Sequence, residues 1–230
     1  MEEELIIYPE ETWRILRDKR KKAIKVLKVL TPLGKPVIVH GSIARGDVRK
    51  DSDIDIVVLE PVVPGLLEYY LTSRGYRIYS KEIIQATPNY VPKVYVYLDP
   101  IEEIVVSYPL APLRPREREF YKWGGELTLR DLLIDKRVPG VNKNLYLIMP
   151  VEKGHTTIPV PGNEEFTAKI LGVSIDLVRE RVSVLTRRRI HGRTGVFLKV
   201  ELGPEEPIES VIRELANRNP FFRKALRNTL

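Results

Sequence analysis

The stretch VIVHGSIARGDVRKDSDIDIVVL, at positions 37–59, constrains the fold of this chain more than any other. It opens with a β-branched apolar run, Val37–Val39, which predicts a short buried strand. A glycine and a serine, Gly41 and Ser42, follow and lead into a short helical turn. After a polar loop, residues 53–59 predict a second strand. The stretch therefore predicts two strands joined by a turn and a loop that both carry polar groups.

Two aspartates stand one residue apart in the second strand. Because side chains alternate between the faces of a strand, Asp53 and Asp55 share one face while Ile54 and Ile56 point into the core. Neighbouring carboxylates repel each other, and a hard divalent cation such as Mg2+ removes that repulsion. Gly41 lets a ligand approach the backbone closely, and N–H groups at a helix start favour an anion such as a triphosphate. The pattern favours a phosphoryl- or nucleotidyl-transfer site.

The same residues resemble a known signature. The string G-S-x-A-R-G-x(5)-S-D-I-D-I, which spans Gly41–Ile56, resembles that of the DNA polymerase β-like nucleotidyltransferases. The resemblance implies a mixed α/β domain built on a mixed sheet. It also implies an enzyme that moves a nucleoside monophosphate from an NTP to an acceptor and releases pyrophosphate. The alternative is a glycine turn before an edge strand whose aspartates are merely solvated.

The resemblance also implies roles for individual residues. The expected nucleotide-binding residues are Gly41, Ser42 and Arg45. Asp53 and Asp55 are expected to be catalytic and to bind Mg2+ or Mn2+. The family usually has a third carboxylate on a later strand, which completes the metal site and deprotonates the attacking hydroxyl. Asp99, at the end of a predicted strand, is the expected third catalytic and metal-binding residue, and Glu82 is the alternative.

Composition narrows the class of protein. The net charge of +7 and the pI near 9.5 suggest acidic partners such as nucleotides or nucleic acid. The absence of cysteine excludes disulfides and thiolate metal sites. No apolar run is long enough to span a membrane, and the acidic start does not resemble a signal peptide, so we expect a cytoplasmic protein without a membrane partner. Residues 11–30 predict a helix whose basic side is either solvated or in contact with phosphates.

A proline- and charge-rich segment, residues 108–118, predicts a linker, with one domain over 1–110 and another over 111–230. In the second domain, residues 165–185 resemble a helix-turn-helix with Ser174 as the N-cap of its second helix. Residues 187–190 and 196–202 then predict a β-hairpin wing, which gives a winged-helix-like domain. Its expected nucleic-acid-binding residues are Arg179, Arg187, Arg188, Arg189 and Arg193.

Other readings of the second domain stay open. In one alternative the helix pair serves only for packing, and in another its arginines bind a triphosphate or an RNA acceptor. The first domain together with the stretch Arg137–Val141 and this tail resembles a group of predicted archaeal nucleotidyltransferases. Residues 208–230 predict a closing helix that breaks at Asn219–Pro220.

The expected protein is therefore a nucleotidyltransferase domain followed by a winged-helix-like domain, with an NTP as partner and RNA or DNA as a second one. Three alternatives compete with a free-standing enzyme of this kind. One is a nucleic-acid-binding regulator that uses the transferase domain as a nucleotide sensor. Another is an antitoxin-type enzyme that modifies a protein hydroxyl. The third is a polymerase-like enzyme that acts on RNA ends. The base of the NTP, the acceptor and the oligomeric state are left open by the sequence.

Overall fold

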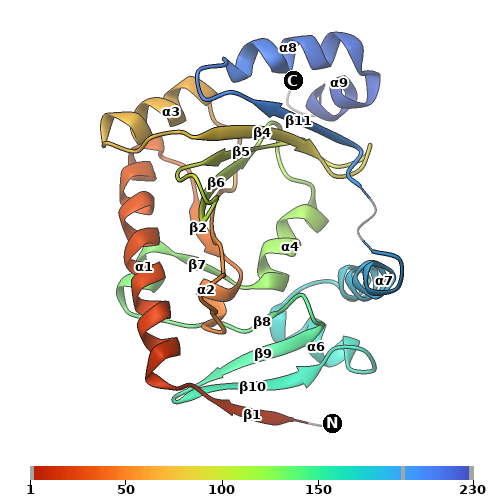
Figure 1. The fold of residues 1–230 in the computed structure, drawn as a ribbon. Helices are drawn as coiled ribbons and strands as arrows, with labels where there is room; N and C mark the ends of the chain where they lie inside the picture. Colours follow the sequence, from red (N-terminus) through yellow and green to blue (C-terminus); the bar gives the residue numbers. More distant parts are fainter. Residues whose placement is uncertain (1–2, 193–194, 228–230) are drawn as a thin grey trace. The chain divides into compact units, whose positions relative to one another are not determined.

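The computed structural model describes residues 3–192 and 195–227, so Arg193 lies outside the described residues. The chain divides into two compact units, each assembled from three segments (Figure 1). The first unit comprises residues 1–24, 39–52 and 115–194, and the second comprises 25–38, 53–114 and 195–230. The chain crosses from the second unit to the first at Arg114–Pro115, within the predicted linker. Its other crossings between the units lie inside the predicted first domain and after α7 (Ile175–His191).

The first unit contains a four-stranded antiparallel sheet with the order β1-β10-β9-β8. One face of this sheet packs on a helix pair, α6 and α7, with Leu147 and Ile158 in a shared core with Leu177 and Val178. The strands are β1 (Glu4–Ile7), β8 (Gly140–Val141), β9 (Tyr146–Val151) and β10 (Gly154–Pro159). The longer helices that lie wholly in this unit are α4 (Pro115–Gly124), α6 (Glu164–Leu171) and α7 (Ile175–His191).

The helix pair α6–α7 forms at the predicted place. Gly172 ends α6 with a φ of 61°, and the Ser174 hydroxyl caps α7 by accepting a hydrogen bond from the Leu177 N–H at 3.3 Å. The predicted wing is wrong. Residues 187–190 continue α7, since no glycine or proline interrupts it before Gly192, and residues 198–202 pair with another strand, in the second unit.

The second unit contains a mixed sheet with the order β11-β4-β5-β6-β3. Strand β3 runs parallel to β6, and the other pairs are antiparallel, as expected for a mixed sheet. The strands are β3 (Ile54–Val58), β4 (Ser80–Gln85), β5 (Lys93–Tyr97), β6 (Ile104–Pro109) and β11 (Leu198–Leu202). The helices are α3 (Pro64–Ser73), α8 (Ile208–Arg218) and α9 (Pro220–Leu226), so the predicted break at Asn219–Pro220 is confirmed.

Two elements carry the chain from one unit to the other. They are the helix α1 (Glu10–Leu30) and the strand β2 (Val37–His40). The remaining short elements are η1 (Thr31–Leu33), α2 (Ser42–Arg45), β7 (Glu126–Thr128) and α5 (Leu129–Leu133). None of the helices in the described part of the chain has the length and apolar character needed to cross a membrane.

Candidate functional site

The Gly-Ser turn lies in the first unit, at the end of β2. Gly41 has a φ of 85°, a conformation that favours glycine, and Ser42 opens the one-turn helix α2. The Gly41 carbonyl accepts hydrogen bonds from the backbone N–H groups of Ala44 and Arg45, at 3.0 and 3.1 Å. Ser42 is partly exposed. The turn therefore has the local shape that the sequence predicted.

Residues far along the chain hold this turn in place. The Gly41 N–H donates to the Gly125 carbonyl at 3.0 Å, and the Val138 N–H donates to the Ala44 carbonyl at 3.2 Å. The approach is too close for side chains, because a Cβ added to Gly124 would lie 2.3 Å from the His40 ring and one on Gly140 would lie 2.7 Å from Gly124 backbone atoms. Sequence reasoning did not connect these glycines with the turn, although the Gly124–Gly125 pair was a possible signal.

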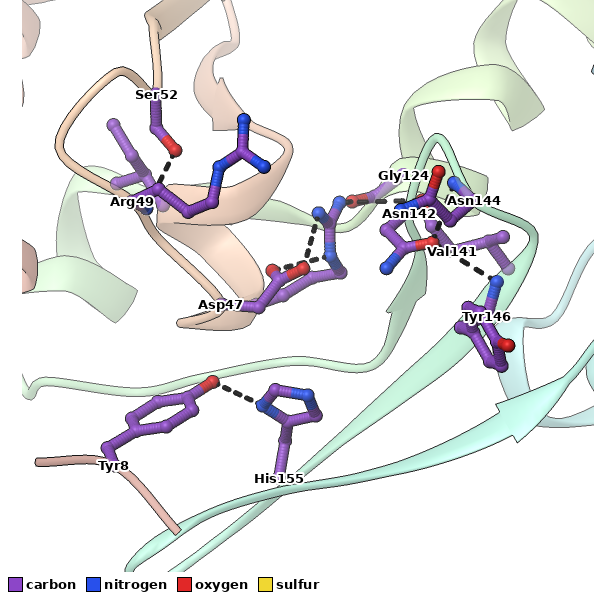
Figure 2. Close-up of polar contacts among 12 residues, drawn as sticks. Tyr8, Asp47, Arg49, Ser52, Gly124, Val141, Asn142, Asn144, Tyr146 and His155 are labelled. Carbon is purple, nitrogen blue, oxygen red and sulfur yellow. Dashed lines mark hydrogen bonds and ion pairs between the residues drawn. The ribbon is translucent and has the colours of Figure 1, made fainter. Parts of the chain in front are cut away.

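Arg45 is built into the turn as a buried structural group. Its Nη1 donates to the Gly124 carbonyl at 2.6 Å, and its Nε and Nη2 donate to the two carboxylate oxygens of Asp47 at 2.9 and 3.0 Å. Figure 2 labels Asp47 and Gly124, which accept these hydrogen bonds. The Arg45 side chain is 7% exposed. Its donors are therefore used within the protein, and the expected contact of Arg45 with a nucleotide stays a prediction.

Two basic residues of α1 also support the motif. Lys19 donates to the Ser52 carbonyl at 2.6 Å, and Arg20 donates to the Ile43 carbonyl at 3.2 and 3.0 Å. Both are buried, and burial lowers the pKa of Arg20 below its usual value. The expectation that the whole basic side of α1 is solvated or contacts phosphates is wrong for these two residues.

A buried tyrosine–histidine pair lies in the same unit. The Tyr8 hydroxyl and His155 Nδ1 are 2.6 Å apart (Figure 2). Burial raises the pKa of Tyr8, and the negative charge of Asp47 adds to the effect. Burial lowers the pKa of His155, so its neutral ring is favoured. The pair is a packed part of the first unit.

The paired aspartates lie in the second unit. Asp53 directly precedes β3 and is exposed, whereas Asp55 lies within β3 and is partly buried. Ile54 and Ile56, between and after them, have no exposed surface. The predicted alternation is therefore confirmed: the apolar side chains enter the core, and the two carboxylates occupy the opposite face. Carboxylate oxygens are the donors that Mg2+ prefers, so this pair fits such an ion.

The structure gives the two candidates for the third carboxylate other contacts. Asp99 closes the turn after β5, because its Oδ1 accepts from the N–H groups of Ile101 and Glu103 and its Oδ2 accepts from Ile104 at 2.6 Å. Glu82 lies on β4, three strands from β3, which corresponds to about 14 Å. Among residues 3–192 and 195–227, no three His, Cys, Asp or Glu side chains lie close enough together to hold a metal ion. The role of Asp99 stays a prediction.

Sequence reasoning missed another acid, Glu103. The parallel register pairs Ile54 with Ile104, and the Ile54 N–H donates to the Glu103 carbonyl at 2.7 Å. Glu103 and Asp53 thus directly precede the first paired residues of β6 and β3. The available signal was its position, since Glu103 directly precedes the apolar run 104–106 just as Asp53 precedes Ile54.

The Gly-Ser turn and the aspartate pair both lie in a segment that matches a known family. Residues 20–121 match the family model of the nucleotidyltransferase domain. The match includes the Gly-Ser turn and both aspartates, and it confirms the resemblance for residues 20–121. Residues 122–230, which include Gly124–Gly125 and the helix pair α6–α7, lie outside the matched segment. Neither the curated proteins nor the solved structures gave a match.

Proposed function

We propose that the protein is a metal-dependent nucleotidyltransferase that moves a nucleoside monophosphate from an NTP to an acceptor hydroxyl. One observation carries the proposal: a segment that matches a nucleotidyltransferase domain holds a Gly-Ser turn and, a few residues later, two aspartates on the open face of a strand. Gly41 and Ser42 would bind the triphosphate, and Asp53 and Asp55 would hold Mg2+ or Mn2+.

The proposed reaction is a single displacement at phosphorus. The acceptor oxygen forms a bond to the α-phosphorus of the NTP, the bond from that phosphorus to the bridging oxygen breaks, and pyrophosphate leaves with the electron pair. A carboxylate takes the proton of the acceptor hydroxyl. When bound, the divalent ion would neutralise phosphate charge and polarise the phosphate oxygens.

We assign the role of proton acceptor to Glu103 in preference to Asp99. Glu103 and Asp53 directly precede Ile104 and Ile54, which pair in the parallel β3–β6 register, whereas both oxygens of Asp99 accept backbone hydrogen bonds. Glu103→Gln should therefore reduce kcat by about 100-fold or more while leaving the NTP bound. Asp99→Asn should lower Tm and change kcat little. The opposite result would return the role to Asp99.

A specific observation favours a second candidate function, nucleic-acid binding without turnover. The two acids of α7, Asp176 and Glu180, lie in its first half and pair with Arg116 at 3.5 and 3.2 Å. The second half contains no acidic residue after Glu180, and its arginines, together with His191, are exposed. We propose phosphate contacts for Arg179, Arg187, Arg188 and Arg189.

Transfer of label from an NTP labelled at the α-phosphate tests the main proposal. The wild type with Mg2+ should label an acceptor, tried in turn as RNA, DNA and protein, and Asp53→Asn or Asp55→Asn should abolish labelling. Asp51→Asn is a matched control, because Asp51 is an exposed aspartate of the same loop that pairs with the exposed Arg49. Equal labelling by wild type and both variants would remove the proposal. Salt-sensitive binding of nucleic acid with no labelling would support the second candidate.

A further inference from the structure

The face of the second unit's sheet that carries Asp55 also carries two tyrosines. The register places Asp55 opposite Val105 and Val105 opposite Tyr97, so these three residues lie in one row. The next row contains Val57, Ser107 and Tyr95. Residues that pair across a sheet point to the same side. Tyr95 and Tyr97 therefore share a face with the carboxylate, and we call this the tyrosine face.

The tyrosine face is the more open face of the sheet, although Val57, Val105 and Ser107 within it are buried. The opposite face consists of alternating residues with no exposed surface, including Ile83, Val94, Val96 and Val106. Tyr95 and Tyr97 are both partly exposed. The sheet thus presents two accessible aromatic rings in adjacent rows. This is the arrangement on which unpaired bases stack in single-strand-binding proteins.

A polar network fixes one of these rings. The Tyr97 hydroxyl donates to Glu82 Oε2 at 3.0 Å, and Lys199 of β11 donates to Glu82 Oε1 at 2.8 Å. Lys199 also pairs with Glu201 at 3.0 Å. Burial and the charge of Glu82 raise the pKa of Tyr97, so the phenol keeps its proton and remains a donor. Glu82, the alternative third carboxylate of the sequence analysis, thereby acquires a different role, which is to hold Tyr97.

The spacing of the strands relates the tyrosines to the carboxylates. Tyr97 lies two strands from Asp55, which corresponds to about 10 Å along the sheet. Strand β6, between them, begins next to Glu103, the residue to which we assign the acceptor proton. A terminal nucleoside whose hydroxyl lies at Glu103 can therefore extend its base over β5, toward Tyr97. This geometry distinguishes a nucleic-acid acceptor from a protein hydroxyl, which has no base to stack.

We propose that the tyrosine face binds the acceptor, and that the acceptor is the 3′ end of a single-stranded nucleic acid whose last bases stack on Tyr97 and Tyr95. The proposal rests on the proposed nucleotidyl transfer and names the class of its second substrate. Stacking on an aromatic side chain contributes about 1–3 kcal/mol per base. Loss of one ring should therefore weaken binding by about 5- to 150-fold.

The test uses the full chain and short single strands of RNA and DNA with 2-aminopurine as the 3′-terminal base, whose fluorescence is quenched by stacking. Wild type and Tyr97→Phe should bind and quench, while Tyr97→Ala should weaken binding and lose the quenching. Tyr69→Ala is the control, because Tyr69 is a 63% exposed tyrosine of α3 in the same unit. Thermal melting of each variant shows that it is folded.

The outcomes separate this inference from the proposed function. If Tyr97→Ala quenches and binds like the wild type, or if the wild type binds no single strand, the tyrosine face is not the acceptor site. That result leaves the transferase proposal in place when Asp53→Asn still abolishes labelling. If quenching depends on Tyr97 but neither the wild type nor any variant transfers label, the tyrosine face binds single strands and the transferase proposal fails. A difference in quenching between the RNA and DNA probes shows which nucleic acid the site prefers.

Discussion

Replacement of Arg45 by alanine separates a structural role from a nucleotide-binding role. Arg45 occupies the arginine position of the signature, yet its guanidinium donates hydrogen bonds to Asp47 and to the Gly124 carbonyl. Arg45→Ala would leave the Asp47 carboxylate, whose side chain is 13% exposed, without its main partner, and it would also orphan the Gly124 carbonyl. The variant should therefore be destabilised.

The size of the effect follows from burial. Breaking a buried ion pair by removing one partner costs about 3–5 kcal/mol. In a chain of this length, 1 kcal/mol corresponds to about 2–4 °C in Tm, so we expect Tm to fall by about 6–20 °C. The double variant Arg45→Ala/Asp47→Ala should recover part of this loss, because it removes the unpaired carboxylate.

The chain offers a matched control four residues later. Arg49 makes the same bidentate pair with Asp51, at 3.1 and 2.9 Å, but its side chain is 78% exposed. Arg49→Ala should leave Tm unchanged within error, because exposed pairs contribute little to stability. Thermal melting by circular dichroism and NTP binding by titration are measured on each variant. An Arg45→Ala protein with wild-type Tm and lost NTP binding would refute the structural role.

Three further predictions test other parts of the structure. Because burial lowers the pKa of His155, the unfolded chain binds the proton first as the pH falls. The free energy of unfolding should therefore decrease below about pH 6.5. Burial raises the pKa of Tyr8, so the unfolded chain loses that proton first as the pH rises, and stability should be lost above about pH 10. Denaturant unfolding across this range should show both losses, reduced at low pH in His155→Gln and at high pH in Tyr8→Phe. Gly140→Ala should destabilise by about 1–3 kcal/mol, because its Cβ would meet Gly124 backbone atoms, while Gly203→Ala, which meets nothing within 4 Å, should not. Replacing Arg187, Arg188 and Arg189 by serine should reduce the slope of log K against log salt for single-strand binding by about 2, whereas the same change at Arg213, Arg218 and Arg223 of α8 and α9 should not.

Local patterns predicted the elements of the motif well. The strand at Val37, the helical turn at Ser42 and the alternation of Asp55 with Ile54 and Ile56 follow from side-chain periodicity, which depends on neighbours only. The N-cap at Ser174 is of the same kind. These features could be read from the sequence because each is determined within a few residues.

Contacts between distant segments were not predictable in this way. The glycines at 124, 125 and 140 are needed because backbone approaches backbone or the side chains of His40 and Arg45, which no local pattern shows. Residues 187–190 were assigned to a strand because a glycine-rich turn follows them, yet the partner of β11 is β4. The burial of Lys19 and Arg20 depends likewise on carbonyl acceptors supplied by α2 and the loop after it.

The central claim is that the aspartate pair supports transfer of a nucleoside monophosphate rather than of a phosphate. Parallel reactions with NTP labelled at the α-phosphate and at the γ-phosphate test it directly. We predict that the α-label appears in the acceptor and the γ-label in released pyrophosphate, and that Asp53→Asn or Asp55→Asn stops both. Appearance of the γ-label in the acceptor, or transfer that survives both substitutions, would contradict the account.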